Sequence, residues 1–456
     1  MEQLPSLVEY GFRRALITLI AIICALLSVM DISIANVAFS DIRWNLGVSP
    51  DEVSWVMTAY SLANIVIMPF SNWLSRRIGR RNYFAISVML FTVCSFFCGN
   101  AVGIQELVTF RFLQGLGGGG MLVLSHTIVT ESWPGKKRAT SQAFFTLGVL
   151  AAGALASPFG GYITNNYSWP FIFFVNIPVG VILCVLILTC VRNGSYEKGE
   201  DWLSTIMLAV GTSCLYIIIA RGHRADWFSR LFFIALLVIG LTGIAFFIYM
   251  QLIFRSRLEK ASVLRRVSLR TGLILSFITA LSVAASSIVF MSLLGWATQL
   301  PAIPLWTNIG SIVVMLAVTA LLIEREKALK YLIATGMLFF AIYAYMLYRT
   351  AFADLSPVYV LGLLVIRNLA VGILSVSLST LTLSTLEGKQ VGHGTALYNI
   401  IKHLGGALGI ALFSARLNQQ VDLTRLDSAY ITILIIGIIF LVCIPFVLYF
   451  VKEDDH

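Results

Sequence analysis

The stretch WVMTAYSLANIVIMPFSNWLSRRIGRR, Trp55–Arg81, contains the pattern that decides the fold. A mostly apolar run is followed at once by four arginines, Arg76, Arg77, Arg80 and Arg81. About 20 apolar residues are what an α-helix needs to cross the hydrocarbon core of a bilayer. Lysines and arginines collect in the loops on the cytoplasmic side of a membrane. The stretch therefore predicts a membrane-spanning helix that ends in a cytoplasmic loop.

The same pattern recurs along all 456 residues, of which 58% are hydrophobic and only 12% are charged. In a soluble protein, about a quarter of the residues are charged. A soluble protein could not cover this much apolar surface with polar groups. We therefore expect an all-α membrane protein of about 14 spans, each close to the length that a bilayer requires. The expected spans are 15–39, 53–73, 83–103, 105–130, 142–164, 168–191, 203–221, 229–254, 271–298, 303–323, 331–348, 357–386, 395–415 and 429–451. The first run is too long for the apolar part of a signal peptide and has no small-residue cleavage site after it, so we expect it to remain as helix one.

The net charge of +10 is distributed as membrane orientation requires. Of the 32 lysines and arginines, 22 fall in the loops and tails expected on the cytoplasmic side, and seven fall in the outer loops. This bias predicts that both termini are cytoplasmic, in the inner membrane of the cell. Basic residues spread over alternate loops argue against nucleic-acid binding. The seven cysteines all lie in apolar stretches, where they are expected to pack as small hydrophobic residues, and we expect no metal and no cofactor.

The longest basic loop divides the chain. Residues 255–270 carry six lysines and arginines and are expected to form a cytoplasmic linker. Many transporters are built from repeated bundles of helices. The parts of comparable length on either side of the linker fit such a repeat.

Two charged residues inside expected spans of the first half are candidates for function. An ionisable residue in a span is costly unless it is paired or faces water. Asp31 is surrounded by apolar residues in the first span, where it could bind and release a proton or meet a cationic substrate; the alternative is an acid at the outer interface. Arg111 lies about one turn inside the fourth span and has Asp31 as its obvious partner, although it could also extend outward past Glu106.

Three further polar residues lie in spans of the second half. Arg367 opens the twelfth span, and no acid occurs in the spans of this half for it to pair with. Lys402 and His403 lie about two turns into the thirteenth span, where His403 is either a packing residue or a proton carrier.

His126, in the fourth span, is treated as structural. Gly117–Gly120 predict close helix packing and not a phosphate loop, because no lysine–serine pair follows them.

Five stretches together resemble the drug/proton antiporters of the major facilitator superfamily, in its fourteen-helix branch of Emr- and Qac-type multidrug exporters. The resemblance covers the whole chain. MDISIANVAFSDI (Met30–Ile42) resembles the first-helix signature, and Trp55–Arg81 is similar to the second helix and its loop. The other three are FRFLQGLGGGG (Phe110–Gly120), ASPFGGYITNNYSWPFIFFVNIPVG (Ala156–Gly180) and LYNIIKHLGGALG (Leu397–Gly409).

The resemblance implies a first six-helix bundle over 1–191, two additional transmembrane helices over 192–254, the cytoplasmic linker over 255–270 and a second six-helix bundle over 271–456. It also implies roles for individual residues. Asp31 would couple protons to substrate, and Arg111 would tune that acid, from helices that face the central cavity. The residues expected to line this cavity are Asn36, Trp55, Tyr60, Gln114, Arg367, Asn399, Lys402 and His403. The residues expected to form conformational motifs are Arg77, Gly79 and Arg80 in the loop, Gly115 in helix four, and Pro158, Gly160 and Gly161 in helix five.

The chain also departs from the family pattern. Arg76 occupies the usual aspartate position of the loop motif, which removes the acidic half of that latch. The usual glycine–proline of helix five is Ala156–Ser157, with Pro158 one residue later. Ala220 stands where many relatives have an acid, and Lys402–His403 replaces the usual arginine–glutamine. The last two changes argue against ordinary specificity for cationic drugs.

The expected function is proton-coupled export of amphiphilic organic compounds by alternating access. A dedicated exporter of one metabolite, such as a siderophore or a lipid, is the alternative on the same fold, and a non-transporting membrane receptor is a more remote one. No catalytic motif is present, so the protein is not expected to be an enzyme. Expected partners are a small amphiphilic molecule, protons and the lipid bilayer, with a periplasmic adaptor and an outer-membrane channel implied by the resemblance.

Overall fold

The structure, a computed structural model, describes most of the chain. The described residues are 9–133, 137–193, 202–221, 230–250, 267–296, 329–350, 357–383, 386, 389–417 and 423–450. The expected span 303–323 and residues 255–266 of the expected linker lie outside them.

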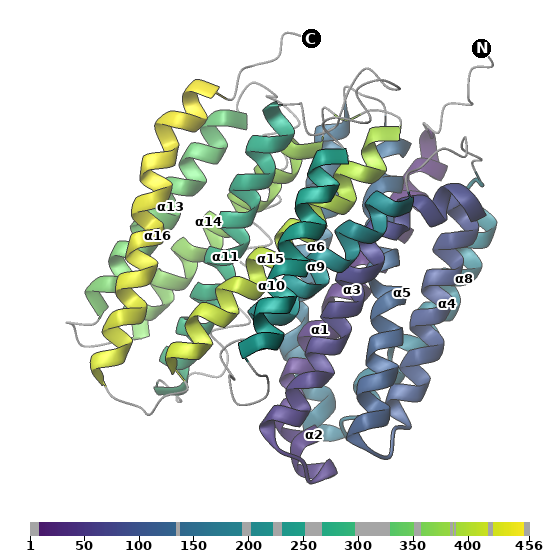
Figure 1. Cartoon of the computed structure of the whole chain (residues 1–456), viewed down its shortest axis with the longest axis horizontal. Helices are drawn as coiled ribbons and strands as arrows, with labels where there is room; N and C mark the ends of the chain where they lie inside the picture. Colours follow the sequence, from purple (N-terminus) through teal and green to yellow (C-terminus); the bar gives the residue numbers. More distant parts are fainter. Residues whose placement is uncertain are drawn as a thin grey trace.

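The described residues form a series of α-helices in the order that the sequence predicts (Figure 1). The helices of the first half are α1 (Gly11–Val37), α2 (Phe39–Leu46), α3 (Pro50–Ile78), α4 (Arg80–Gly99), α5 (Ile104–Ser132), α6 (Arg138–Asn166), α7 (Phe171–Phe174) and α8 (Asn176–Cys190). They are followed by α9 (Trp202–Arg221) and α10 (Arg230–Tyr249), and then by α11 (Val267–Trp296), α13 (Leu329–Thr350), α14 (Pro357–Leu383), α15 (Lys389–Leu417) and α16 (Leu423–Phe450).

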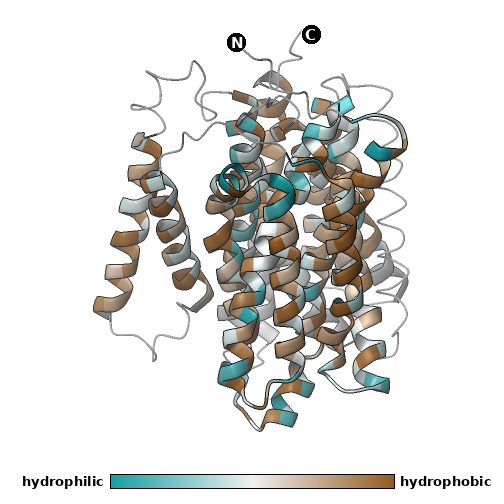
Figure 2. Cartoon of the chain, turned by 90° about the vertical axis from the view of Figure 1, so that its right-hand side faces the viewer, coloured by the Kyte–Doolittle hydropathy of each residue, from teal (hydrophilic) through white to brown (hydrophobic). Residues whose placement is uncertain are grey.

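Within the described residues, eleven helices are long and apolar enough to cross a membrane, and Ile433–Leu448 of α16 is a shorter apolar stretch. Their order agrees with the expected spans and with a multi-pass membrane protein. Hydrophobic residues predominate along the helices (Figure 2), and many large apolar side chains are exposed, as hydrocarbon requires. The helix α15 is not among the eleven, and the polar residues Asn399, Lys402 and His403 lie near its middle.

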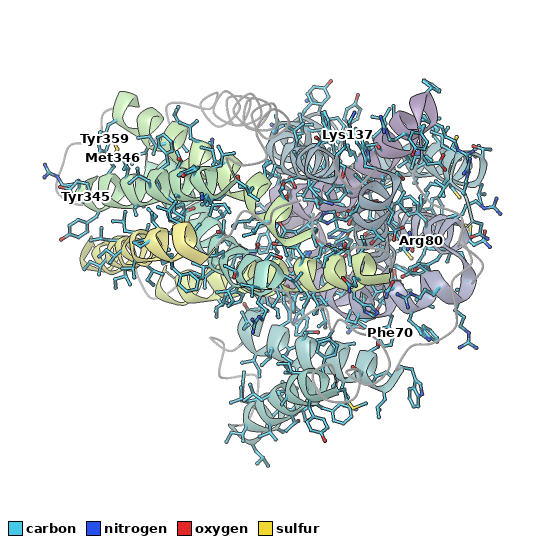
Figure 3. The ribbon with its side chains drawn as sticks, turned by 90° about the horizontal axis from the view of Figure 1, so that it is seen from above. Phe70, Arg80, Lys137, Tyr345, Met346 and Tyr359 are labelled. Carbon is cyan, nitrogen blue, oxygen red and sulfur yellow. The ribbon has the colours of Figure 1, made fainter. Side chains whose placement is uncertain are left out.

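The helices pack in two groups, with a hairpin beside them. In one group α5 packs on α1, α3 and α4, while α1 also packs on α6 and α4 on α8. In the other, α11 packs on α14 and α15, and α13 packs on α14 and α16. We call these groups the first and the second bundle. The helices α9 and α10 pack on each other, and α9 also contacts α3 and α15, so the hairpin lies where the two bundles meet (Figure 3).

Helix ends explain one element that the sequence analysis did not predict. The short helix α2 follows α1 directly and ends at Gly47, whose φ of 65° is left-handed and favours glycine. The next helix, α3, begins with a capping box, in which the Ser49 side chain accepts a hydrogen bond from the Glu52 amide and the Glu52 carboxylate accepts one from the Ser49 amide. Since Pro50 occupies the first helical position, α3 starts three residues before the expected span.

Glycines allow α5 to touch two neighbouring helices at once. A Cβ added to Gly115 would overlap the backbone carbonyl of Tyr60 on α3, and one added to Gly117 would lie 2.7 Å from the Ser87 carbonyl oxygen on α4. Small residues permit such close backbone packing in membranes. The packing role predicted for these glycines is confirmed, and it places Arg111, one turn before Gly115, against α3.

Opposite ends of the bundles differ in charge. The helix α1 begins, and α16 ends, at the same end of the molecule, which we call the basic end because Arg14, Arg80 and Lys137 lie there (Figure 3 labels the last two). The opposite end carries α2 and the start of α5.

At the far edge of the second bundle, Tyr359 of α14 donates a hydrogen bond of 2.8 Å to the Met346 carbonyl of α13.

Candidate functional site

The first feature of the candidate site is a buried ion pair between Asp31 of α1 and Arg111 of α5. Arg111 Nη1 donates to Asp31 Oδ2. The two residues are 4% and 0% exposed. The sequence predicted this partner for Arg111, and the structure has it. It also predicted that the pair faces the central cavity, whereas the pair is enclosed within the first bundle.

Side-chain amides complete the coordination of this carboxylate. Asn176, at the start of α8, donates to Asp31 Oδ1 at 2.7 Å, and Gln114 donates to the same oxygen at 3.2 Å. Gln114 Oε1 in turn accepts from Arg111 Nη1 at 2.8 Å, and Gln114 Nε2 lies 2.7 Å from Ser95 Oγ of α4. A buried charge is tolerated only when such partners replace water. We call Asp31, Ser95, Arg111, Gln114 and Asn176 the carboxylate network.

The guanidinium of Arg111 is held on its other sides by aromatic rings and by the backbone. Its Cζ lies 4.3 Å from the ring centroid of Tyr60 and 5.4 Å from that of Phe173. Arg111 Nε donates to the Val56 carbonyl at 3.3 Å. A cation over an aromatic face is stabilised by the ring quadrupole. One nitrogen, Nη2, is buried without a hydrogen-bond partner among the residues that the structure describes, so the arginine depends strongly on Asp31.

The expected cavity residues Tyr60 and Gln114 therefore belong to the interior of the bundle. Both are fully buried, at 0% exposure. The Tyr60 hydroxyl donates to the Ser28 carbonyl of α1 at 3.1 Å, which ties α3 to α1 a turn away from Asp31. In this conformation, neither side chain is accessible to a ligand.

A second buried ion pair lies at the basic end. Arg80, the first residue of α4, pairs with Glu131 near the end of α5, and both side chains are 8% exposed. The sequence analysis expected the loop latch to lack its acid because Arg76 occupies the usual position. In the structure, Arg80 has an acidic partner from another helix, α5. Arg77, in contrast, is exposed, and its Cζ lies 5.3 Å from the ring centroid of Trp73.

The turn between α3 and α4 depends on Gly79. Its φ is 96°, a region that L side chains rarely adopt. A Cβ there would also overlap the Asn193 side chain, which follows α8. This glycine was expected in a conformational motif, and its geometry explains why the loop can fold back over the end of α8.

The two bundles contact each other near the basic end through aromatic side chains. The imidazole of His126 on α5 stacks on Phe145 of α6, with centroids 4.1 Å apart and an interplanar angle of 14°. Tyr398 of α15 meets His126 edge-on at 5.8 Å. His126 is 1% exposed and bonds Gln142 Oε1 through Nε2 at 2.5 Å. His126 thus packs at the seam between the bundles, in keeping with the structural role predicted for it.

Two further pairs extend this seam. Thr146 of α6 and Ser379 of α14 share a hydrogen bond of 2.8 Å. Gly392 of α15 packs against the side chain of Asn72 on α3, beside a small pocket lined by Ser71, Ser75, Arg80, Val123, Leu124, Thr127 and Ile128 together with these two residues. Every one of these contacts lies in the half of its helix nearer the basic end.

Space opens beyond the seam toward the opposite end. Gly153 lies seven residues after Thr146 and so on the same face of α6, about 10 Å farther along the helix. Gly406 lies eight residues after Tyr398 on α15. A Cβ at either glycine would meet nothing within 4 Å. The contacts described between the bundles thus gather near the basic end, and these two positions beyond it face open space.

The remaining expected residues lie in different surroundings. Arg367 of α14 is held by α11, where it donates to Ser286 Oγ at 2.9 Å, to Ser287 Oγ and to the Val283 carbonyl at 3.3 Å. Asn399 is buried and donates to the Thr395 carbonyl at 3.0 Å. The side chain of Asn36 is exposed, and those of three further residues are partly exposed: Trp55, Lys402 and His403. The helix α6 is continuous through Pro158, Gly160 and Gly161.

Sequence reasoning missed Ser95, Asn176 and Glu131. Serines and amides are common in membrane helices, and only the packing of α4 and α8 shows that Asn176 bonds Asp31 and that Ser95 bonds Gln114. Glu131 comes directly before Ser132, the last residue of α5, and a carboxylate within a few residues of the basic loop Lys136–Arg138 is the signal that could have identified it.

Comparison with protein families agrees with this architecture. Residues 21–410 match the model of the Major Facilitator Superfamily. The chain is similar to the fatty acid resistance protein FarB of Neisseria gonorrhoeae, with 29% identity over 422 residues, which are 89% of this chain and 81% of that protein. It is also similar to the multidrug export protein EmrB of Escherichia coli (strain K12), with 27% identity over 427 residues, 88% of this chain and 80% of that one.

Among solved structures, the fold is similar to that of the human organic anion transporter MFSD10. The TM-score is 0.68 at 12% sequence identity, and the match covers 95% of this chain and 99% of that one. At this identity the likeness concerns the fold alone. The arrangement of two helix bundles around a central seam is thus that of known transporters.

Proposed function

Because this chain belongs to the Major Facilitator Superfamily, we propose that it exports amphiphilic organic compounds across the inner membrane of the cell in exchange for protons. The similarity to EmrB, whose name describes multidrug export, supports efflux of several compounds. Two bundles whose described contacts gather near one end suit alternating access, in which a central space opens to one side of the membrane at a time.

The observation that carries the proposal is the enclosed carboxylate of Asp31. It is bonded by Arg111, Gln114 and Asn176, which come from two other helices. Protonation of Asp31 removes the charge that these donors stabilise and leaves Arg111 buried without a counter-ion, which is strongly unfavourable. Binding of a proton must therefore rearrange α1, α5 and α8 relative to one another. This gives a physical link between proton binding and the shape of the first bundle.

A proton can drive transport only by favouring one of two conformations over the other. In our proposal, the conformation with the basic end closed contains deprotonated Asp31 paired with Arg111. Protonation from the opposite side weakens this pair and favours opening of the basic end, where substrate enters. The seam residues His126, Tyr398, Thr146 and Ser379 separate in that step.

The orientation and the partner proteins belong to the same proposal. The basic end would face the cytoplasm, as the distribution of lysine and arginine predicts, with both termini on that side. The opposite end would face the periplasm, where an adaptor and an outer-membrane channel would receive the exported compound.

The proposal is tested with the full chain in proteoliposomes that carry a pH-sensitive dye inside. A cationic probe, ethidium, and an anionic probe, dodecanesulfonate, are each added to wild-type protein and to Asp31→Asn. We expect wild-type protein to couple movement of at least one probe to proton flux. Asp31→Asn should exchange labelled probe across the membrane without proton flux and without accumulation against a gradient. Accumulation by Asp31→Asn driven by a pH gradient would assign coupling to another group, of which His403 is the first to examine.

A further inference from the structure

The charges near the seam point to one class of substrate. We infer that the space between the bundles binds an amphiphile with an anionic head group, and that Lys402 of α15 is the cation that receives this head group. This inference rests on the proposed transport function and specifies its substrate class.

The first step is the balance of charge within the membrane. The expected spans of the second half contain Arg367 and Lys402 but no aspartate or glutamate. In the first half, Asp31 is neutralised by Arg111, and Glu131 near the basic end by Arg80. The spans therefore have two cations that no acid within them compensates. Such charges are expensive in a membrane unless water or an anion reaches them.

Lys402 differs from the other cations in the number of groups that bind its side chain. Arg111 and Arg80 have carboxylates, and Arg367 has the Ser286 and Ser287 hydroxyls of α11. Lys402, in contrast, has no hydrogen bond or ion pair with the part of the chain that the structure describes. Its Nζ lies 5.3 Å from the ring centroid of Tyr398, one turn earlier on α15. Lys402 is also partly exposed, so a ligand can reach it.

The helices packed against α15 place no free acid near Lys402. Besides α11, α9 and α14, whose described residues contain no aspartate or glutamate, α15 packs on α3, α5 and α16. The one acid in the described part of α16 is Asp427, in the second turn of that helix at the opposite end. The acids of α3 and α5 lie at their ends: Asp51, Glu52 and Glu106 in the first turns at the opposite end, and Glu131 at the basic end in its pair with Arg80. The field at Lys402 is therefore positive, which attracts anions and repels cations.

Lys402 lies on α15 at the boundary between the seam and the open space. Tyr398 contacts His126 across the seam, and Lys402 follows one turn nearer to the opposite end. One turn beyond Lys402, at Gly406, a Cβ would meet nothing within 4 Å. The ammonium group thus lies between the closed seam and the open space.

A second polar group at this boundary has an unused hydrogen-bonding atom. His126 Nδ1 is buried without a partner within the described residues, and the His126 ring touches both Phe145 and Tyr398. When the seam separates, this imidazole can offer an N–H to an anion next to Lys402, while the aromatic rings beside it contact the apolar chain. A cationic head group would find neither a carboxylate nor a negative field here.

The test uses two permanently charged probes with the same alkyl chain, dodecanesulfonate and dodecyltrimethylammonium. Saturable binding of each labelled probe is measured on the full chain in lipid nanodiscs, and counterflow is measured in proteoliposomes. The variants are Lys402→Gln, Lys402→Arg and Lys402→Glu. Lys330→Gln is the matched control, because Lys330 also lies over a tyrosine ring, that of Tyr331 at 5.2 Å, but at the basic end of α13.

We expect wild-type protein to bind the sulfonate more tightly than the ammonium probe. Lys402→Gln should weaken sulfonate binding about tenfold, the usual effect of losing one charge-assisted hydrogen bond, whereas Lys402→Arg and Lys330→Gln should bind it as the wild type does. Lys402→Glu should gain affinity for the ammonium probe, a result that loss of folding cannot produce.

Equal or tighter binding of the ammonium probe by wild-type protein would overturn the inference, and so would sulfonate binding that is unchanged in Lys402→Gln. Failure of both alkyl probes to bind would also overturn it. In that last case, ethidium exchange in the same proteoliposomes separates the two failures: exchange would leave the proposed transport function standing, and its absence would count against both.

Discussion

Gly392 of α15 packs so closely against Asn72 of α3 that a Cβ at position 392 would overlap the Asn72 side-chain oxygen. These residues belong to different bundles, and Asn72 is 5% exposed. Gly392→Ala should therefore weaken closure of the basic end, by about 1–3 kcal/mol for an overpacked contact. Hydrogen–deuterium exchange of the α15 segment that begins at Lys389 should become faster.

The matched control for this contact is Gly362→Ala, since a Cβ at Gly362 of α14 meets nothing within 4 Å. Asn72→Ala combined with Gly392→Ala should restore slow exchange, because it removes the overlapping atom. Equal exchange in Gly392→Ala and the wild type would show that the seam does not depend on this contact.

The Asp31–Arg111 pair should show energetic coupling. Arg111→Ala should reduce proton-coupled transport less when Asp31→Asn is also present, because the lone buried charge is then already absent. A double-mutant cycle on probe binding should give a coupling energy of about 0.5–3 kcal/mol, as for other residues in contact. Arg111→Lys should rescue only in part, since an ammonium group lacks the planar fork that reaches Asp31 through Nη1 and the Val56 carbonyl through Nε. Strictly additive losses would contradict the pairing.

Glu131 should be needed for stability at the basic end. Glu131→Gln removes the carboxylate that pairs with the buried Arg80, and breaking a buried pair in this way costs about 3–5 kcal/mol. The thermal unfolding temperature of the purified protein should fall clearly. The combination with Arg80→Gln should recover part of the loss, and a combination less stable than Glu131→Gln alone would argue against the ion pair.

Gly115→Ala should disturb the contact between α3 and α5 and, with it, the carboxylate network. The new methyl group would overlap the Tyr60 carbonyl, and Tyr60 lies over the Arg111 guanidinium. We expect a loss of about 1–3 kcal/mol in stability together with weaker proton coupling. Gly103→Ala is the control, because a Cβ before the first turn of α5 meets nothing within 4 Å. A Gly115→Ala protein as stable as this control would contradict the close packing.

Much of this fold could be predicted from the sequence because membrane spans depend on length and hydropathy, which are local properties. The pairing of Asp31 with Arg111 could also be predicted, since Asp31 is the acid farthest from the ends of the first-half spans. The short helix α2 could not be predicted, because eight residues of mixed polarity have no distinctive pattern. The spacing of Ser49 and Glu52 is that of a capping box and marks the start of α3.

The partners of Asp31 show where prediction from sequence stops. Gln114 lies three residues after Arg111, and it was expected in the cavity, yet its amide bridges Arg111, Asp31 and Ser95. Which face of α5 turns toward α4 and α8 depends on the packing of three helices, and each has several polar residues. Asn176 lies 145 positions from Asp31, so only the assembled bundle brings them together.

The α9–α10 hairpin limits how molecules dissolved in the bilayer can approach. It contacts α3 of the first bundle and α15 of the second through α9, and so it lies over the lateral junction on that side (Figure 3). A lipid-like molecule that diffuses within the leaflet meets α9 there before it reaches the space between the bundles. On this side of the molecule, α9 therefore stands between the surrounding lipid and the junction of α3 with α15.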